Sequence, residues 1–484
     1  MNSVWQTLTL STLPLQQWLS ASYLHYPIGR LRAWRKGSWL MQWAEPIGGV
    51  LALLVFALAP FVNNTLTGLL LGACGAYWAL LTLSDEAAGS SQSGGTSLRG
   101  LARLGALATP IHLLVGVYWS IAVVATALSP VKREAFVGLQ KLTLYLLFFA
   151  LLARVLRSPR MRSWVITVFL LTALAVSVYG IQQWFMGTDA LATWVDPESP
   201  LSKTTRVYSY LGNPNLLGGY LVPAVVFSIV AFFAWPSWMC KGLALVMTAV
   251  NGACLMLTFS RGAWIGLVVS MLVLALLLAH WWSIYLPRFW RTWALPMVLG
   301  TSVGVVLLAI VVVEPLRDRV TSIFAGRGDS SNNFRINVWM AVLDMIRDRP
   351  VWGIGPGNNA FNKIYPLYQR PRFSALSAYS IVLEVAVETG LIGLVAFLWL
   401  IFVTLAQGWK ALNRLRETSN LAGFWLIGAI AALIGMFSHG LFDTVLYRPE
   451  VNTLWWLMFA LIASYYQFQP GGSSLSSSIN RMAP

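Results

Sequence analysis

The 484-residue sequence predicts an all-α integral membrane protein with about twelve transmembrane helices and a large, partly helical outer loop between helices 9 and 10. Hydrophobic residues make up 57% of the chain and charged residues only 10%, whereas soluble domains carry about 25% charged residues. Apolar runs of roughly 20 residues recur along the chain, and each is long enough to cross ~30 Å of hydrocarbon as a helix. These Leu-, Val- and Ala-rich runs favour helices over barrel strands, because backbone polar groups in lipid must be satisfied internally.

The apolar runs divide the chain into five expected regions. These are a cytoplasmic segment at 1–38, a bundle of about nine helices at 39–315, an outer loop at 316–381, three last helices at 382–468 and a disordered tail at 469–484. The expected spans cover residues 40–61, 64–83, 107–128, 137–155, 163–184, 212–234, 240–258, 262–282, 293–314, 382–406, 422–442 and 452–468.

The lysines and arginines of the short loops indicate the orientation of the chain, since they are enriched on the cytoplasmic side of membrane proteins. With the N-terminus inside, the inner loops hold most of them: Arg30, Arg32, Arg35, Lys36, Arg154, Arg157, Arg160, Arg162, Arg288, Arg291, Lys410, Arg414 and Arg416. We therefore expect both termini to be cytoplasmic and the 316–380 block to lie outside.

The hydrophilic block at 316–380 carries nine Lys or Arg against four Asp, a net charge of +5, and contains neither His nor Glu. Residues 334–347 have the apolar spacing of an amphipathic helix, which Pro350 ends. The glycines at 353, 355 and 357 predict a tight turn after it. A cationic block that is partly folded suggests an anionic ligand.

Several classes of function do not fit the sequence. The net charge of +16 could suit a nucleic-acid partner, but the basic residues are spread between apolar runs instead of forming one patch. Cys74, Cys240 and Cys254 lie in or beside apolar runs without metal-ligand spacing. No glycine motif for a nucleotide is present. We therefore expect no nucleic acid, no metal and no cofactor.

Three arginines stand at expected outer ends of spans, namely Arg206, Arg261 and Arg335. A single arginine at a membrane boundary is commonly an interfacial anchor. Together, their forked donors would suit a phosphate, a carboxylate or bicarbonate. Asn213 and Asn215 follow Arg206 at a helix start whose N–H groups also favour anions, so they join the predicted anion site.

Two further pairs of ionisable residues lie four residues apart. His439 and Asp443 would share a helix face, either as a proton-handling pair or as a structural hydrogen bond. Glu384 and Glu388 begin the tenth expected span, and we expect each to meet an arginine of the outer block or Arg448.

The motifs and their order resemble the O-antigen ligase and polymerase superfamily over roughly residues 200–400. The resemblance rests on Arg206, Gly212-Asn213-Pro214-Asn215, Ser260-Arg261-Gly262-Ala263-Trp264, Arg335, Trp339, Asp348-Arg349-Pro350, the glycines at 353–357, and Tyr379, Glu388, Gly390 and Gly393. The likeness implies a bacterial inner-membrane protein with a large periplasmic loop. It also implies metal-independent glycan transfer from an undecaprenyl diphosphate carrier, with Arg206 and Arg261 at diphosphate-binding positions.

One position departs from the superfamily. Its ligases carry a histidine, taken as the catalytic base, nine residues before the glutamate that aligns with Glu388, whereas this chain has Tyr379 followed by Ser380. Tyrosine, with an ordinary pKa near 10, is a poor general base at neutral pH. Either His439 takes over the role of the base, or this branch transfers no glycan.

Within the superfamily, the run Ser377-Ala378-Tyr379-Ser380 and the run Arg448-Pro449-Glu450-Val451 look most like the cyanobacterial IctB family. That family is designated as a bicarbonate transporter involved in inorganic carbon accumulation. The main hypothesis is therefore a cyanobacterial plasma-membrane protein that binds bicarbonate at the outer arginines. The alternatives are a glycan ligase or polymerase and a non-catalytic scaffold.

Overall fold

The computed structural model describes residues 2–10, 30–85, 109–188, 205–312, 326–444 and 448–467, together with Arg317, Thr321 and Leu446. Every regular element in these ranges is a helix. Most of the loop expected after the second span, and the C-terminal tail, lie outside the described residues.

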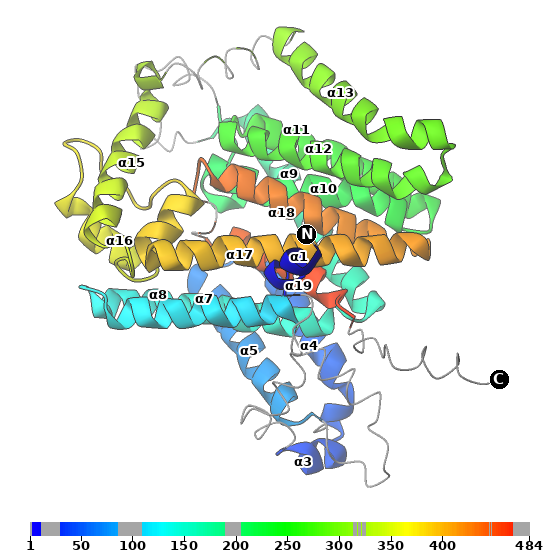
Figure 1. The fold of residues 1–484 in the computed structure, drawn as a ribbon, viewed down its shortest axis with the longest axis horizontal. Helices are drawn as coiled ribbons and strands as arrows, with labels where there is room; N and C mark the ends of the chain where they lie inside the picture. Colours follow the sequence, from blue (N-terminus) through cyan, green and yellow to red (C-terminus); the bar gives the residue numbers. More distant parts are fainter. Residues whose placement is uncertain are drawn as a thin grey trace.

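The helices run along the chain in one series (Figure 1). The α-helices are α1 Asn2–Leu8, α3 Arg32–Gly37, α4 Ala44–Leu58, α5 Asn64–Leu83, α7 Pro110–Ala127, α8 Lys132–Val155, α9 Pro159–Met186, α10 Pro214–Ala234, α11 Trp238–Leu257, α12 Arg261–Trp282, α13 Arg288–Val312, α15 Ser330–Asp348, α16 Asn358–Ile364, α17 Ile381–Glu417, α18 Ala422–Gly440 and α19 Pro449–Ser464. The 3₁₀ helices are η2 Leu40–Trp43, η4 Ser209–Leu211, η5 Ser283–Tyr285, η6 Gly326–Gly328 and η7 Tyr365–Leu367.

Within the described ranges, eleven helices are long and apolar enough to cross a membrane, which confirms the predicted all-α membrane fold. The twelfth expected span coincides with α19, which has 16 residues and is not among the eleven. α19 is buried along nearly its whole length. The sequence expectation of twelve spans counted this apolar helix because a hydropathy pattern does not distinguish lipid contact from enclosure by other helices.

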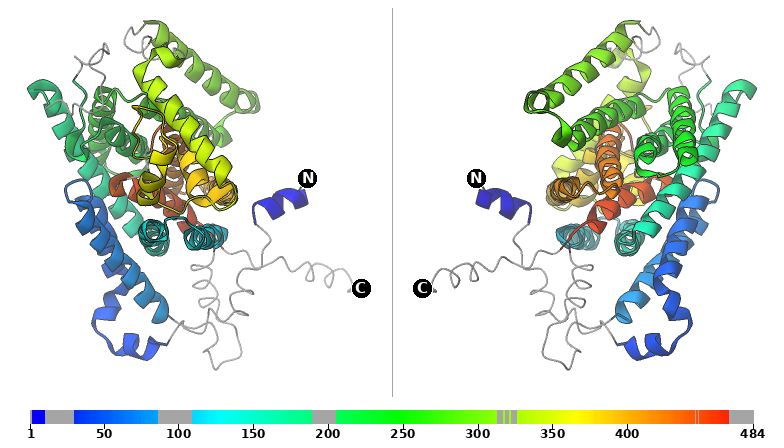
Figure 2. Two further views of the ribbon diagram at one scale, coloured as in Figure 1. Left: turned by 90° about the vertical axis from the view of Figure 1, so that its left-hand side faces the viewer. Right: turned by 90° about the vertical axis from the view of Figure 1, so that its right-hand side faces the viewer.

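The centre of the bundle is formed by α10, α18 and α19. α10 packs against α9, α11, α12 and α18, and α18 also contacts α12, α17 and α19. α10 and α19 are apolar around their circumference, which is the pattern of a helix with no exposed face. α13 lies at the periphery, where Figures 1 and 2 place it on the opposite edge from α4 and α5. No described α13 side chain is buried, and its large apolar side chains suit contact with lipid.

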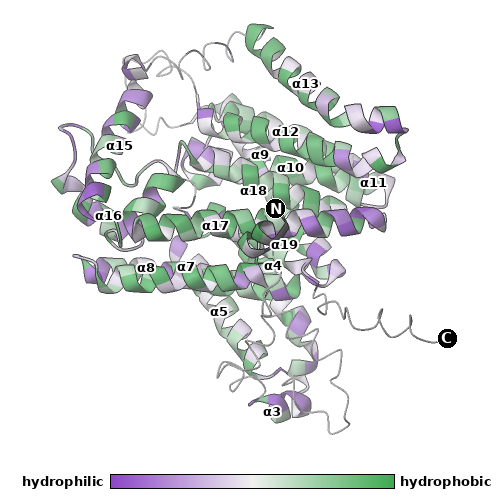
Figure 3. Ribbon diagram, in the orientation of Figure 1, coloured by the Kyte–Doolittle hydropathy of each residue, from purple (hydrophilic) through white to green (hydrophobic). Residues whose placement is uncertain are grey.

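The outer block folds at one end of the bundle, where α15 and α16 are the most hydrophilic described helices (Figure 3). α15 confirms the amphipathic helix expected at 334–347. Val338, Val342 and Met345 of α15 join Phe361 of α16 and Val387 of α17 in a small core separate from that of the bundle. Burial raises the pKa of Tyr365 to about 12, so its hydroxyl stays protonated and donates to the carbonyl of Phe373 at 2.7 Å. The block is therefore a packed unit fixed to the start of α17.

The glycine turn predicted at 353–357 is present and joins this block to two helices. Gly353, Gly355 and Gly357 all have positive φ angles, which glycine adopts without steric cost. The N–H of Gly355 donates to the carbonyl of Glu388 at 2.9 Å, and Ser129 Oγ donates to the carbonyl of Ile354 at 2.6 Å. These contacts reach α17 and the start of α8.

Candidate functional site

Arg206 precedes α10 and is held at the outer junction of α10 and α11. Its Nε donates to the carbonyl of Thr258 at 3.0 Å, and its Nη2 donates to Asn215 Oδ1 at 3.0 Å. Asn213 caps α10 instead, since its side-chain oxygen accepts the N–H groups of Asn215 and Leu216. Of the two predicted asparagines, Asn215 therefore positions the guanidinium, whereas Asn213 starts the helix.

Arg261 opens α12, three residues after the carbonyl that Arg206 contacts. Ser260 caps this helix by accepting the N–H of Ala263. The Arg261 side chain is 11% exposed, and its Nη2 lies 2.9 Å from Asp329 Oδ1. Asp329 also caps α15 by accepting the N–H of Asn332 at 2.9 Å. One carboxylate thus connects an arginine of the bundle with the start of the outer helix.

Arg335 lies on α15, one to two turns beyond that cap. Its Nη1 donates to Ser331 Oγ at 2.9 Å, and its Nη2 lies 3.6 Å from Asp443 Oδ2. Its buried Nε has no partner within the described part of the chain. Asp443, which is 7% exposed, also accepts the N–H of Thr444 at 2.7 Å. Arg335 therefore connects the outer block with the segment that follows α18.

His439 is fully buried near the end of α18 and packs against α12. A Cβ added at Gly262 would lie 2.7 Å from its Cδ2, and one at Gly266 would lie 3.0 Å from its Cβ. Both ring nitrogens lack a hydrogen-bond partner in the described residues. The expected sharing of a helix face with Asp443 was wrong, because α18 ends at Gly440 and Asp443 turns toward Arg335.

These contacts bring four distant segments to one outer region. Arg206 is connected to Thr258 before α12, Arg261 of α12 to Asp329 of α15, and Arg335 of α15 to Asp443 after α18. Sequence reasoning missed Thr258 and Asp329. The aspartate before Ser330 is a recognisable helix cap, but its pairing with Arg261 has no local signal.

Tyr379 and Ser380 lie where α17 begins. Tyr379 is half-buried with φ +49°, and its ring contacts Phe334 edge-on at 5.4 Å between centroids. Ser380 is 5% exposed and stands directly before the helix, where its side chain forms no capping bond. Two residues earlier, Ser377 Oγ lies 2.7 Å from Thr444 Oγ1, which connects this segment with the residue after Asp443.

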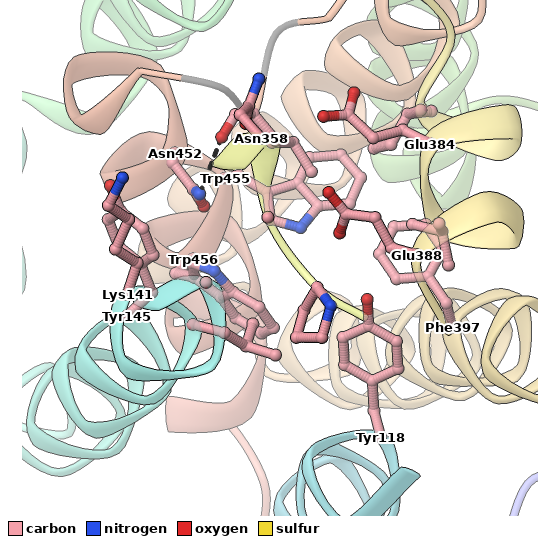
Figure 4. A pocket seen from close by; sticks show the side chains of 17 residues that line it. Tyr118, Lys141, Tyr145, Asn358, Glu384, Glu388, Phe397, Asn452, Trp455 and Trp456 are labelled. Atoms are coloured by element: carbon pink, nitrogen blue, oxygen red, sulfur yellow. Dashed lines mark hydrogen bonds between the residues drawn. The ribbon is translucent and has the colours of Figure 1, made fainter. Parts of the chain in front are cut away.

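Glu384 and Glu388 do not pair with arginines as expected. The Glu388 side chain accepts the N–H of Gly357, and the Glu384 side chain hydrogen-bonds the hydroxyl of Thr444. Both point from α17 into a cavity of about 140 Å³ (Figure 4). Among the described residues, no group of three or more His, Cys, Asp or Glu could hold a metal ion.

The comparisons with known proteins agree with this region of the chain. Residues 243–398 match the family model described as O-Antigen ligase, which covers about a third of the sequence. The matched segment contains Arg261, Asp329, Arg335, Tyr379 and Glu388. No curated protein matches the chain. With its membrane-spanning helices and this match, the chain is a polytopic membrane protein with an O-antigen ligase domain.

Proposed function

We propose that the protein transfers a glycan from a polyprenyl diphosphate carrier to an acceptor hydroxyl. The observation that carries the proposal is the contact chain of arginines at the outer region. Arg261 and Arg335 lie within the segment that matches the O-antigen ligase family, and Arg206 is fixed to the same helix junction. A lipid-linked donor suits this place, because its chain would lie in the membrane while its diphosphate reached the outer surface.

The arginines would act on the leaving group. The acceptor oxygen forms a bond to the anomeric carbon of the glycan, and the bond from that carbon to the diphosphate oxygen breaks. The electron pair of the broken bond stays on the polyprenyl diphosphate. Guanidinium groups held in place by Asn215 and Asp329 would stabilise that growing negative charge without reorganising.

The acceptor proton requires a base, and we assign that role to His439. It is a neighbour of Arg261 through Gly262, and its ring nitrogens bond to no described residue. An imidazole has an ordinary pKa near neutrality, unlike the phenol of Tyr379. Because His439 is fully buried, the acceptor must reach it by a small separation of α12 and α18.

The proposal is tested with the full chain in proteoliposomes that contain a polyprenyl-diphosphate-linked glycan and an acceptor glycolipid. We expect release of polyprenyl diphosphate coupled to the appearance of a glycosylated acceptor, with no added metal. His439→Gln should lower this rate by about 10²- to 10⁴-fold, the usual contribution of a general base. Failure of the native protein to consume any lipid-linked glycan would refute the proposed function.

Replacing Tyr379 with histidine supplies the base that the superfamily carries at that position. We expect Tyr379→His to raise the transfer rate, and to restore activity partly in the His439→Gln background. Tyr379→Phe is the matched control and should leave the rate of the native protein within about twofold if the phenol takes no proton. A large loss in Tyr379→Phe would instead assign the proton transfer to Tyr379.

A second candidate function is binding or transport of bicarbonate, as the IctB likeness implies. It is favoured by the cationic outer block without histidine, in which Tyr379 replaces the usual base. The same proteoliposomes discriminate between the two functions. Bicarbonate flux that disappears in Arg206→Ala, in vesicles that consume no lipid-linked glycan, would support transport over transfer.

A further inference from the structure

The cavity of about 140 Å³ lies between α8, α17 and α19 at the outer end of the bundle, where the residues 356–358 close it (Figure 4). None of the three predicted anion-binding arginines lines it. It is therefore a second concave region, separate from the arginines, and the transfer chemistry described above does not use it.

Aromatic rings form much of the cavity wall. Trp455 and Trp456 of α19, Tyr145 of α8, Tyr118 of α7 and Phe397 of α17 all line it. Phe397 stacks on Trp455 with 6.0 Å between ring centroids and 15° between planes. Flat, polarisable faces of this kind bind ligands that are planar or that present a face of C–H groups.

Polar atoms without partners also line the cavity. Trp455 is fully buried, yet its indole N–H has no hydrogen-bond partner in the described residues. Asn452 donates its amide to the carbonyl of Leu446 at 3.0 Å, while its buried Oδ1 accepts no bond. Buried polar groups are seldom left unpaired, so an indole donor and an amide acceptor facing one cavity point to a polar ligand.

Charges of both signs border the same space. The carboxylates of Glu384 and Glu388 point into it from α17, and Lys141 lines it from α8 (Figure 4). A strongly anionic ligand would meet the two carboxylates, and a strongly cationic one would meet the ammonium group. The lining therefore favours a neutral ligand that both donates and accepts hydrogen bonds.

We propose that this cavity binds one neutral pyranose residue. A pyranose has C–H faces that can stack on the tryptophans and hydroxyls that can bond the Trp455 N–H, Asn452 Oδ1 and the glutamates. The volume is close to that of the roughly 150 Å³ cavity known to hold one benzene molecule, so it has room for a single six-membered ring.

The position of the cavity relates it to the arginines. Thr444 hydrogen-bonds Glu384 at the cavity and directly follows Asp443, which pairs with Arg335. A sugar in the cavity would thus lie one residue away from the contact chain that contains Arg261 and Arg335. That this sugar belongs to the transferred or accepting glycan rests on the proposed function, whereas its binding does not.

The test measures binding of methyl glycosides to the full chain by saturation-transfer NMR. The protein is held in lipid nanodiscs, because maltoside detergents would supply glucose units. The probes are the methyl glycosides of glucose, galactose, mannose and N-acetylglucosamine, with glucosamine and glucuronate as charged analogues. We expect at least one neutral glycoside to bind, with its ring C–H protons most strongly saturated, and the charged analogues to bind more weakly.

Two variants and one control locate the binding. Glu388→Gln keeps an acceptor for the N–H of Gly357, and Asn452→Leu removes the orphan amide oxygen; each should weaken glycoside binding by about tenfold. Glu417→Gln makes the same chemical change at the far, exposed end of α17 and should bind like the native protein. Thermal unfolding of each variant checks that it is folded.

The proposal is overturned if no neutral glycoside binds, if Glu388→Gln and Asn452→Leu both bind like the native protein, or if glucosamine binds while neutral glycosides do not. Its failure is distinguishable from that of the transferase proposal. Arg206→Ala should abolish transfer and leave glycoside binding unchanged. Glycoside binding in a native protein that consumes no lipid-linked glycan would leave this inference standing and refute the transferase function.

Discussion

Arg206→Ala is expected to lower the rate of glycan transfer by about 10²- to 10³-fold, the usual loss when one preorganised donor to a developing negative charge is removed. The guanidinium is fixed from two sides, by the carbonyl of Thr258 and by Asn215 Oδ1. Arg206→Lys should recover little of the rate, since an ammonium group cannot reproduce the planar fork that meets both acceptors and a phosphate. Single-turnover kinetics with the lipid-linked donor measures the effect.

The control for this variant is Arg347→Ala on α15. Arg347 is 77% exposed in its side chain and pairs with Asp344 three residues earlier, so its removal should leave the rate unchanged. Comparison of the two unfolding temperatures separates lost catalysis from lost structure, because Arg206 also satisfies a backbone carbonyl. An Arg206→Ala protein that retains a third or more of the native rate would contradict the assignment.

Gly390→Ala is expected to destabilise the protein and to abolish transfer together. Gly390 interrupts α17 with φ +71° and ψ −179°, a backbone conformation that is essentially restricted to glycine and costs other residues about 1–3 kcal/mol. A Cβ at this position would also overlap the carbonyl of Val351, which is backbone and has no rotamer to change. The N–H of Leu391 donates to the carbonyl of Pro350 at 2.8 Å here, so relief of the overlap would move the whole glycine turn.

Tryptophan fluorescence during heating in nanodiscs, together with the transfer assay, measures this result. Gly252→Ala in α11 is the matched control, because a Cβ there would meet nothing within 4 Å and alanine favours a helix. The Gly390→Ala protein should unfold at a lower temperature, and the Gly252→Ala protein should not. Native stability in Gly390→Ala would show that the turn and α17 are not held together as described.

Local patterns predicted the helices well, since a chain in lipid must satisfy its backbone groups within each segment. The amphipathic spacing at 334–347 corresponds to α15, and the glycines after Pro350 form the expected turn. The pattern failed where the environment of a helix mattered. It extended the helix of His439 as far as Asp443, and it counted the enclosed helix α19 as a span.

Sequence alone determined the class of the protein, the positions of its helices and the identity of three arginines, because hydropathy and turn chemistry are properties of neighbouring residues. Only the tertiary structure decided which groups those arginines meet. Arg261 pairs with Asp329, Arg335 with Asp443, and Glu384 and Glu388 line a cavity instead of forming ion pairs. These partners lie far apart in the chain, and the packing of α12, α15, α17 and α18 brings them together, so no local pattern could have revealed them.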